Sequence, residues 1–148
     1  MIKLIVLFLL SNAFIYANSF WTLTGVTKAS IYVENKVAYI DPATIKKAKE
    51  KMLKMFESAE IRVDLPDSPT LILDMQDIQN DEDHYVYLKL SLGEEVTTFR
   101  DTRDGTYALT YQTTDFIETD AEDLNNAILE SVDSLLATFI EQFEDDKE

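Results

Sequence analysis

Alternation of apolar and polar side chains between residues 70 and 92 is the feature that most limits how this chain folds. Apolar side chains occupy every second position in two runs: Leu71, Leu73, Met75, Val86, Leu88, Leu90 and Leu92. A period of two predicts β-strands that bury one face and leave the other polar. Because the acidic segment 79–83 separates the runs, we expect Thr70–Ile78 and His84–Leu92 to pair as an antiparallel hairpin.

Further strands are predicted on both sides of this hairpin. Glu95–Arg100 and Thr106–Gln112 flank an Asp104-Gly105 step, whose residues tolerate the positive φ angles of a tight turn. Upstream, the β-branched and aromatic residues of Thr27–Ile40 predict either one long strand or two strands joined by a turn at Asn35-Lys36. The second half of the chain is therefore expected to form an antiparallel meander.

Two amphipathic helices accompany the strands. Asp41-Pro42 predicts a helix start, because Asp can cap and Pro fits the first helical position, and apolar residues then recur at helical spacing over residues 45–59. A capping box of Thr119 and Glu122 predicts a second helix that runs to about Phe143. Both helices need an apolar surface against which to pack.

The predicted order of elements indicates the fold class. Glu60–Leu65 adds a short strand before Pro66, so the order is strand, helix, several strands, helix. We expect an α+β two-layer sandwich, with an antiparallel sheet of four or five strands and two helices on one face. Residues 18–148 would form this single domain, with an acidic C-terminal tail.

The first 17 residues have the composition of a secretory signal peptide. Lys3 supplies the positive start, Leu4–Leu10 is an unbroken apolar run, and the small residue Ala17 precedes the expected cleavage site. The apolar stretch is shorter than the roughly 20 residues that span a bilayer, so an uncleaved anchor is the weaker alternative. We expect a periplasmic or secreted mature chain with no transmembrane span. The sequence has no cysteine, which excludes a lipoprotein anchor and thiol chemistry.

A set of short motifs spans residues 26 to 144. The motifs are Ala59-Glu60-Ile61, Pro69-Thr70-Leu71-Ile72-Leu73, Tyr85-Val86-Tyr87-Leu88-Lys89-Leu90, Val96 followed by Arg100, and Tyr107-Ala108-Leu109-Thr110-Tyr111. Their arrangement resembles a family of small exported bacterial proteins of unknown function. The layout is also similar to sandwich domains of envelope proteins that act in transport or assembly. The resemblance implies this fold and an accessory role in the cell envelope.

Charge is distributed unevenly over a strongly acidic chain. There are 13 Lys and Arg and 28 Asp and Glu, and the net charge of −15 argues against binding nucleic acid through its phosphates. Positive charge gathers on the first predicted helix, at Lys46, Lys47, Lys49, Lys51 and Lys54. Lys46 and Lys47 are candidate binding residues for anionic lipid, cell-wall polymer or an acidic partner. The alternative is a solvated helix face that balances an acidic neighbour, such as the C-terminal helix.

One histidine and several carboxylates cluster in the predicted acidic loop. His84 follows Asp81, Glu82 and Asp83, an arrangement that fits a metal site or a general base, and equally a solvated hairpin loop. Asp77–Asp83 offers oxygens to Ca²⁺ but lacks the spacing and the glycine of an EF-hand. The sequence contains no phosphate-binding loop or nucleophile motif. We therefore predict a protein that is not an enzyme and that holds no metal or cofactor.

The polar face of the predicted sheet carries the remaining candidate residues. They are Tyr85, Tyr87, Tyr107, Tyr111, Asp74 and Arg100. Asp74 and Arg100 form either a cross-strand ion pair or part of a ligand-contact surface. Because tyrosine gives a large contact area at low entropy cost, this face is typical of an interface. We expect an exported binding or accessory module that contacts an envelope protein through Tyr85, Tyr87 and Arg100. The alternative is a periplasmic protein that binds a small ligand or a cation.

Overall fold

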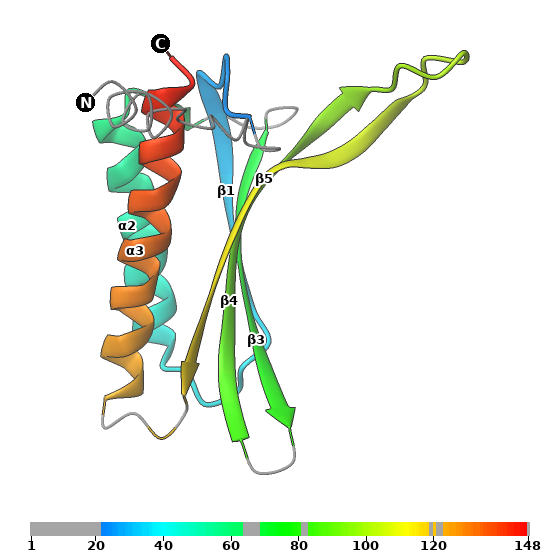
Figure 1. Cartoon of the computed structure of the whole chain (residues 1–148). Coiled ribbons are helices and arrows are strands. Elements are labelled where there is room, and N and C mark those ends of the chain that lie inside the picture. The colour runs from blue at the N-terminus through cyan, green and yellow to red at the C-terminus, as the bar shows by residue number, and fades with distance from the viewer. Residues whose placement is uncertain (1–21, 64–68, 81–82, 119, 121–122, 148) are drawn as a thin grey trace, which may run out of the picture.

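The computed structural model describes residues 22–63, 69–80, 83–118, 120 and 123–147. Its elements are β1 (Lys28–Asn35), α2 (Pro42–Ser58), β2 (Arg62–Val63), β3 (Thr70–Asn80), β4 (Asp83–Thr97), β5 (Gly105–Glu118) and α3 (Leu124–Asp145). The strands form one sheet in the order β2-β1-β3-β4-β5. The helices lie side by side on one side of this sheet (Figure 1). The predicted α+β class is confirmed.

The sheet is mixed, whereas we predicted an antiparallel one. β1 runs parallel to both of its neighbours, with Ile31 opposite Leu71 of β3 and Ala29 opposite Val63 of β2. The cause is α2, which returns the chain to the starting end of β1 before the next strand begins. β1 is a single strand. The Asn35 side chain binds the backbone N–H and carbonyl of residue 37, so the bend there leads to α2 rather than to a second strand.

The strands of the second half pair as predicted but differ in length. β3 and β4 are antiparallel, from Thr70 opposite Gly93 to Asn80 opposite Asp83. β4 continues through Gly93, so the two strands predicted at 84–92 and 95–100 are one. Its connection to β5 is the loop 98–104, in which Arg103 and not Gly105 has a positive φ, 48°. The prediction of a tight turn at Asp104-Gly105 is therefore wrong. Of the strand predicted at 60–65, the structure describes only β2, since residues 64–68 lie outside the described ranges.

Both helices begin with contacts that differ from the predicted caps. Asp123 caps α3, and its carboxylate accepts a hydrogen bond of 3.0 Å from the N–H of Asn126. The predicted capping residues Thr119 and Glu122 lie outside the described residues. α2 begins at Pro42 as predicted, but the side chain of residue 41 makes no capping hydrogen bond.

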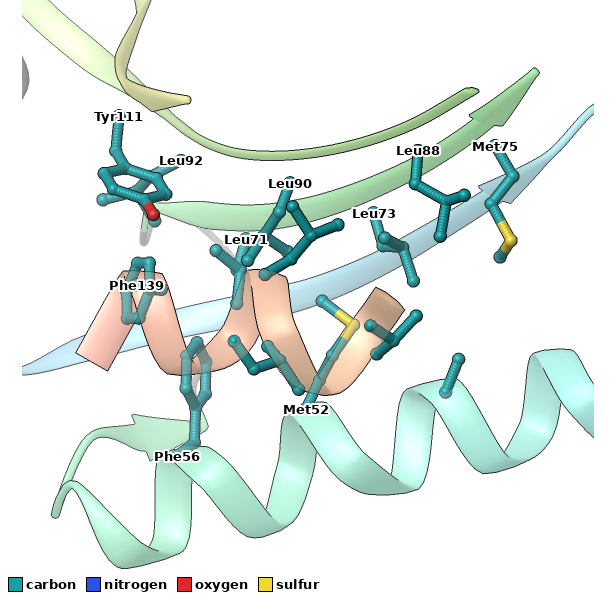
Figure 2. Packing of buried hydrophobic residues seen from close by; sticks show 14 of the residues in the cluster. Met52, Phe56, Leu71, Leu73, Met75, Leu88, Leu90, Leu92, Tyr111 and Phe139 are labelled. Carbon is teal, nitrogen blue, oxygen red and sulfur yellow. The ribbon is translucent and has the colours of Figure 1, made fainter. Parts of the chain in front are cut away.

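The core fills the space between the sheet and the two helices. Most of the largest side chains with at most 1% of their surface exposed come from one face of β3 and β4 and from the facing stripes of the helices, among them Met52, Phe56, Leu71, Leu73, Met75, Leu88, Leu90, Leu92 and Phe139 (Figure 2). Burial of these apolar side chains is the main force that holds the layers together.

Tyr111 belongs to this core and not to the polar face on which we expected it. It is 3% exposed, and its ring packs edge-on against Phe139 with centroids 5.1 Å apart. The reason is a β-bulge. Leu92 lies opposite Tyr111 but Gly93 lies opposite Leu109, so Thr110 is an extra residue in β5. An extra residue reverses which face the following side chains occupy.

β4 and β5 extend past the rest of the sheet as a two-stranded hairpin. β3 begins at Thr70, opposite Gly93, and beyond that point the described pairing of β4 is with β5, as far as Thr97 opposite Gly105. We call residues 93–109 the arm. The arm projects away from the helices and from β1 (Figure 1).

Candidate functional site

The sheet surface opposite the helices, which we call the open face, carries an aromatic pair. Tyr85 and Tyr87 lie on it as expected, because they alternate along β4 with buried Val86 and Leu88. The ring of Tyr87 packs against Phe116 of β5 with centroids 4.9 Å apart, and Phe116 remains 59% exposed. This pair lies on the two strands at one side of the sheet, where nothing described covers it.

A nearly buried carboxylate occupies the middle of the open face. Asp74 of β3 is 5% exposed and lies directly opposite Lys89, whose Nζ is 3.5 Å from Oδ2. Gln76 donates from Nε2 to the same oxygen at 2.6 Å, and Lys36 Nζ lies 3.9 Å from Oδ1. Among the described residues Oδ1 has no hydrogen-bond partner. Two amines therefore balance a carboxylate that is held within the sheet surface.

Arg100 is not part of this face, so the predicted Asp74–Arg100 ion pair is wrong. Arg100 lies in the loop at the end of the arm, where its carbonyl accepts a hydrogen bond of 2.9 Å from the N–H of Arg103. Lys89 takes the predicted position beside the carboxylate. The reason is the length of β4 and β5, whose pairing carries the loop beyond the end of β3.

Two groups beside the open face have raised pKa values. A hydrogen bond to Glu34 raises the pKa of Lys36, and the charge of Asp74 acts in the same direction. Burial raises the pKa of Tyr39 to about 12, and so does the hydrogen bond of 3.0 Å that its hydroxyl donates to Asp77. Both groups therefore keep their protons at neutral pH, and neither can act there as a general base.

The acidic loop that we weighed as a metal or catalytic site lies mostly outside the described part of the chain. Asp81 and Glu82 are outside the described ranges, and so are the side chains of Asp83 and His84. Within the residues that the structure describes, no group of three or more His, Cys, Asp or Glu is placed to hold a metal ion. The alternatives for His84 stay predictions.

The arm exposes three large side chains, of which only Tyr107 was among the residues predicted for the polar face. Phe99, in the loop, is fully exposed, and Tyr107 and Leu109 of β5 are 57% and 39% exposed. The side chain of Tyr107 crosses Gly93 on the neighbouring strand, where a Cβ atom would collide with the phenol ring. Phe99 was predicted to lie near the end of the strand Glu95–Arg100, and the structure places it in the loop 98–104 instead.

The lysine face of α2 is a separate surface on the helix layer. Lys46 and Lys47 are exposed there, and the Nζ of Lys46 lies 3.9 Å from Glu50. Lys51 reaches α3 instead, with its Nζ 2.7 Å from both carboxylate oxygens of Asp133. Part of the positive charge thus balances the acidic helix, as the alternative interpretation expected. The structure brings Tyr85 and Tyr87 together but leaves the lysines and Arg100 in other places.

Comparisons with known proteins complete the description of these surfaces. Within the described ranges, none of the helices combines the length and apolar content that crossing a membrane requires. The resemblance to small exported proteins stays a prediction, because no protein-family model and no curated protein matches the sequence.

Proposed function

We propose that this protein is an exported, non-enzymatic binding or accessory module that contacts another protein of the cell envelope through its arm and open face. The observation that carries the proposal is Phe99, a fully exposed aromatic residue at the end of the arm. A two-stranded hairpin has little core of its own, and a large exposed apolar side chain gains free energy when a partner buries it. The arm is therefore suited to present Phe99 to a partner.

The arm continues the open face, which supports a single binding surface. Gly93 and Glu95 follow Ser91 in alternation along β4, and Leu109 and Tyr107 lie opposite them on β5. Tyr107 and Leu109 therefore lie on the strand face that also carries the aromatic pair. A surface rich in tyrosine with scattered charge has the composition that protein interfaces favour.

Site-directed crosslinking tests this function. A photo-reactive amino acid in place of Phe99 should give a discrete crosslinked product in the envelope fraction. The same amino acid in place of Leu53, which is an exposed apolar residue of α2, is the matched control. Equal products from both positions, or none from Phe99, would contradict a specific contact at the arm.

Export is tested separately on the native protein. The apolar run Leu4–Leu10 and the small residue Ala17 support cleavage after position 17. Mass spectrometry should therefore find a chain that begins near Asn18 in the periplasmic or secreted fraction. Recovery of the full chain from cytosol would show that this part of the proposal is wrong.

Binding of a small ligand or a cation is the second candidate function, and Asp74 is the observation that favours it. This buried carboxylate has one oxygen without a hydrogen-bond partner among the described residues. Two neighbouring amines weaken its attraction for a cation. We expect millimolar Ca²⁺ to raise the melting temperature no more than NaCl of equal ionic strength does. A saturable shift that Asp74→Asn abolishes would favour this second function instead.

A further inference from the structure

The outer edge of β5 is a long strand edge with little protection. Among the described strands β5 has a single neighbour, β4, and the opposite edge of the sheet is formed by the two residues of β2 and, past Ala29, by β1 itself. From Thr106 to Thr114 the strand contains no charged residue and no proline, which are common means of blocking an added strand. Its bulge is covered, because the N–H of Thr22 donates to the carbonyl of Thr110 at 2.9 Å. The edge from Tyr111 onward has no other backbone partner among the described residues.

A groove lies between this edge and α3. It has a volume of about 210 Å³, and its lining residues are Tyr111, Gln112, Thr113, Thr138, Glu141, Gln142 and Asp145. Farther along, the hydroxyl of Ser131 donates to Asp115 at 2.6 Å and joins the helix to the strand. Glu141 and Asp145 are the charged lining residues and no lining residue is basic, so the helix side of the groove is acidic.

Tyr111 lines the groove and carries a polar group that lacks a partner among the described residues. Its hydroxyl is buried and makes no hydrogen bond with the described residues. Burial raises the pKa of Tyr111 to about 12; the nearby Thr113 side chain opposes the rise, but its geometry falls short of a hydrogen bond. The hydroxyl is thus a proton donor at neutral pH, and a buried donor without an acceptor costs free energy.

We propose that the groove receives an extended segment of a partner protein in which basic and apolar side chains alternate, and that this segment adds a strand to β5. Successive side chains of a strand point to opposite faces. Those on the helix side would meet Glu141 and Asp145, and those on the other side would lie beside exposed Phe116. Backbone hydrogen bonds to the edge would supply affinity, and the two rows of side chains would supply specificity.

The negative net charge of this protein favours a basic partner segment over a second copy of this chain. The net charge of −15 attracts a basic segment and opposes close approach of another acidic copy. The inference rests on the proposed protein-binding function and extends it, because it assigns the partner's chemistry at a surface separate from Phe99.

A synthetic peptide in which Lys and Val alternate is the probe, and titration calorimetry measures its binding to the mature protein. We expect saturable binding that Glu141→Gln with Asp145→Asn weakens at least about tenfold. The control Glu57→Gln with Asp120→Asn removes the same charge from exposed positions outside the groove and should leave the affinity within about twofold. Thermal unfolding checks that all variants are folded.

Two further peptides separate strand addition from simple charge attraction. The same peptide with alternate amides N-methylated loses the donors for the β5 edge and should bind at least about tenfold more weakly. A peptide of alternating Glu and Val should not bind. Equal binding of the methylated peptide, absence of binding by the parent, or a dimer of the protein through β5 in sedimentation would each overturn the proposal. If any of these results occurred while Phe99 still crosslinked to a partner, the proposed function would stand and only strand addition at the groove would be rejected.

Discussion

Strands β4 and β5 run through both the arm and the rest of the sheet with its two helices, which we call the body. The two regions differ in what covers these strands. In the body, alternate residues of β4 such as Leu88, Leu90 and Leu92 are at most 1% exposed, because both helices pack on that face. Past Gly93 the same face of β4 continues with Glu94 and Val96, and both are only partly buried. The pattern that makes a strand is therefore local, whereas burial depends on elements that are distant in the chain.

Truncation of a phenylalanine in each region tests this difference most strongly. Phe139→Ala removes a fully buried ring that packs against Tyr111, and we expect a loss of about 3–5 kcal/mol in the free energy of unfolding. Phe99→Ala at the end of the arm should change it by less than about 0.5 kcal/mol. Urea unfolding of both variants measures the difference. A large loss for Phe99→Ala would mean that the arm packs against the molecule's own surface.

Unfolding at alkaline pH tests whether the Tyr111 side chain is buried in the core. Its pKa is about 12 when folded and 10 as its ordinary value, so unfolded chains lose this proton first as the pH rises. The raised pKa contributes about 2–3 kcal/mol to the free energy of unfolding. This contribution is complete below pH 10 and disappears as the pH passes through 12. The stability curves of the protein and of Tyr111→Phe should therefore separate over this window, because only the tyrosine chain loses this contribution. Parallel curves would show that another group causes the alkaline loss.

The junction between body and arm is tested at Gly93. Gly93→Ala places a Cβ against the ring of Tyr107, and we expect a cost of about 1–3 kcal/mol. Tyr107→Ala in the same chain should recover part of this cost, because the two changes act on one contact. Thermal unfolding of the two single variants and the double variant gives the coupling. Strict additivity would contradict the packing of Tyr107 over Gly93.

A small effect is expected at the ion pair between the two helices. Lys51 and Asp133 are paired at 2.7 Å but more than half of the carboxylate side chain remains exposed. Asp133→Asn should therefore cost less than about 1 kcal/mol, and high salt should reduce the difference. A loss as large as that of Phe139→Ala would mean that charge, and not apolar packing, holds the helix layer.

The sequence predicted those features that depend on neighbours in the chain. The alternation that places Val86 inside and Tyr85 and Tyr87 outside is a backbone property, and so are the helical stripes of α2 and α3. The α+β class follows from these periods. Of the candidate site, the placement of Tyr85 and Tyr87 on the open face was predictable for the same reason.

The remaining features depend on pairing between distant segments. Tyr107 and Tyr111 have the same parity in the sequence, but the extra residue Thr110 sends one to the open face and the other to the core. Register likewise decides that Lys89 and not Arg100 lies beside Asp74. The parallel placement of β1 depends on the path of α2, which periodicity alone does not specify.

The narrowing of the sheet at Gly93 has a mechanical consequence. Three or more strands backed by helices form a stiff plate, whereas the two strands beyond Thr70 form a thin ribbon with no layer behind them in the described part of the chain. We expect a load applied at Phe99 to bend the ribbon at its root, beside Gly93 and the bulge at Thr110, before it deforms the plate. We therefore expect the tip of the arm to change position more easily than the rest of the molecule changes shape.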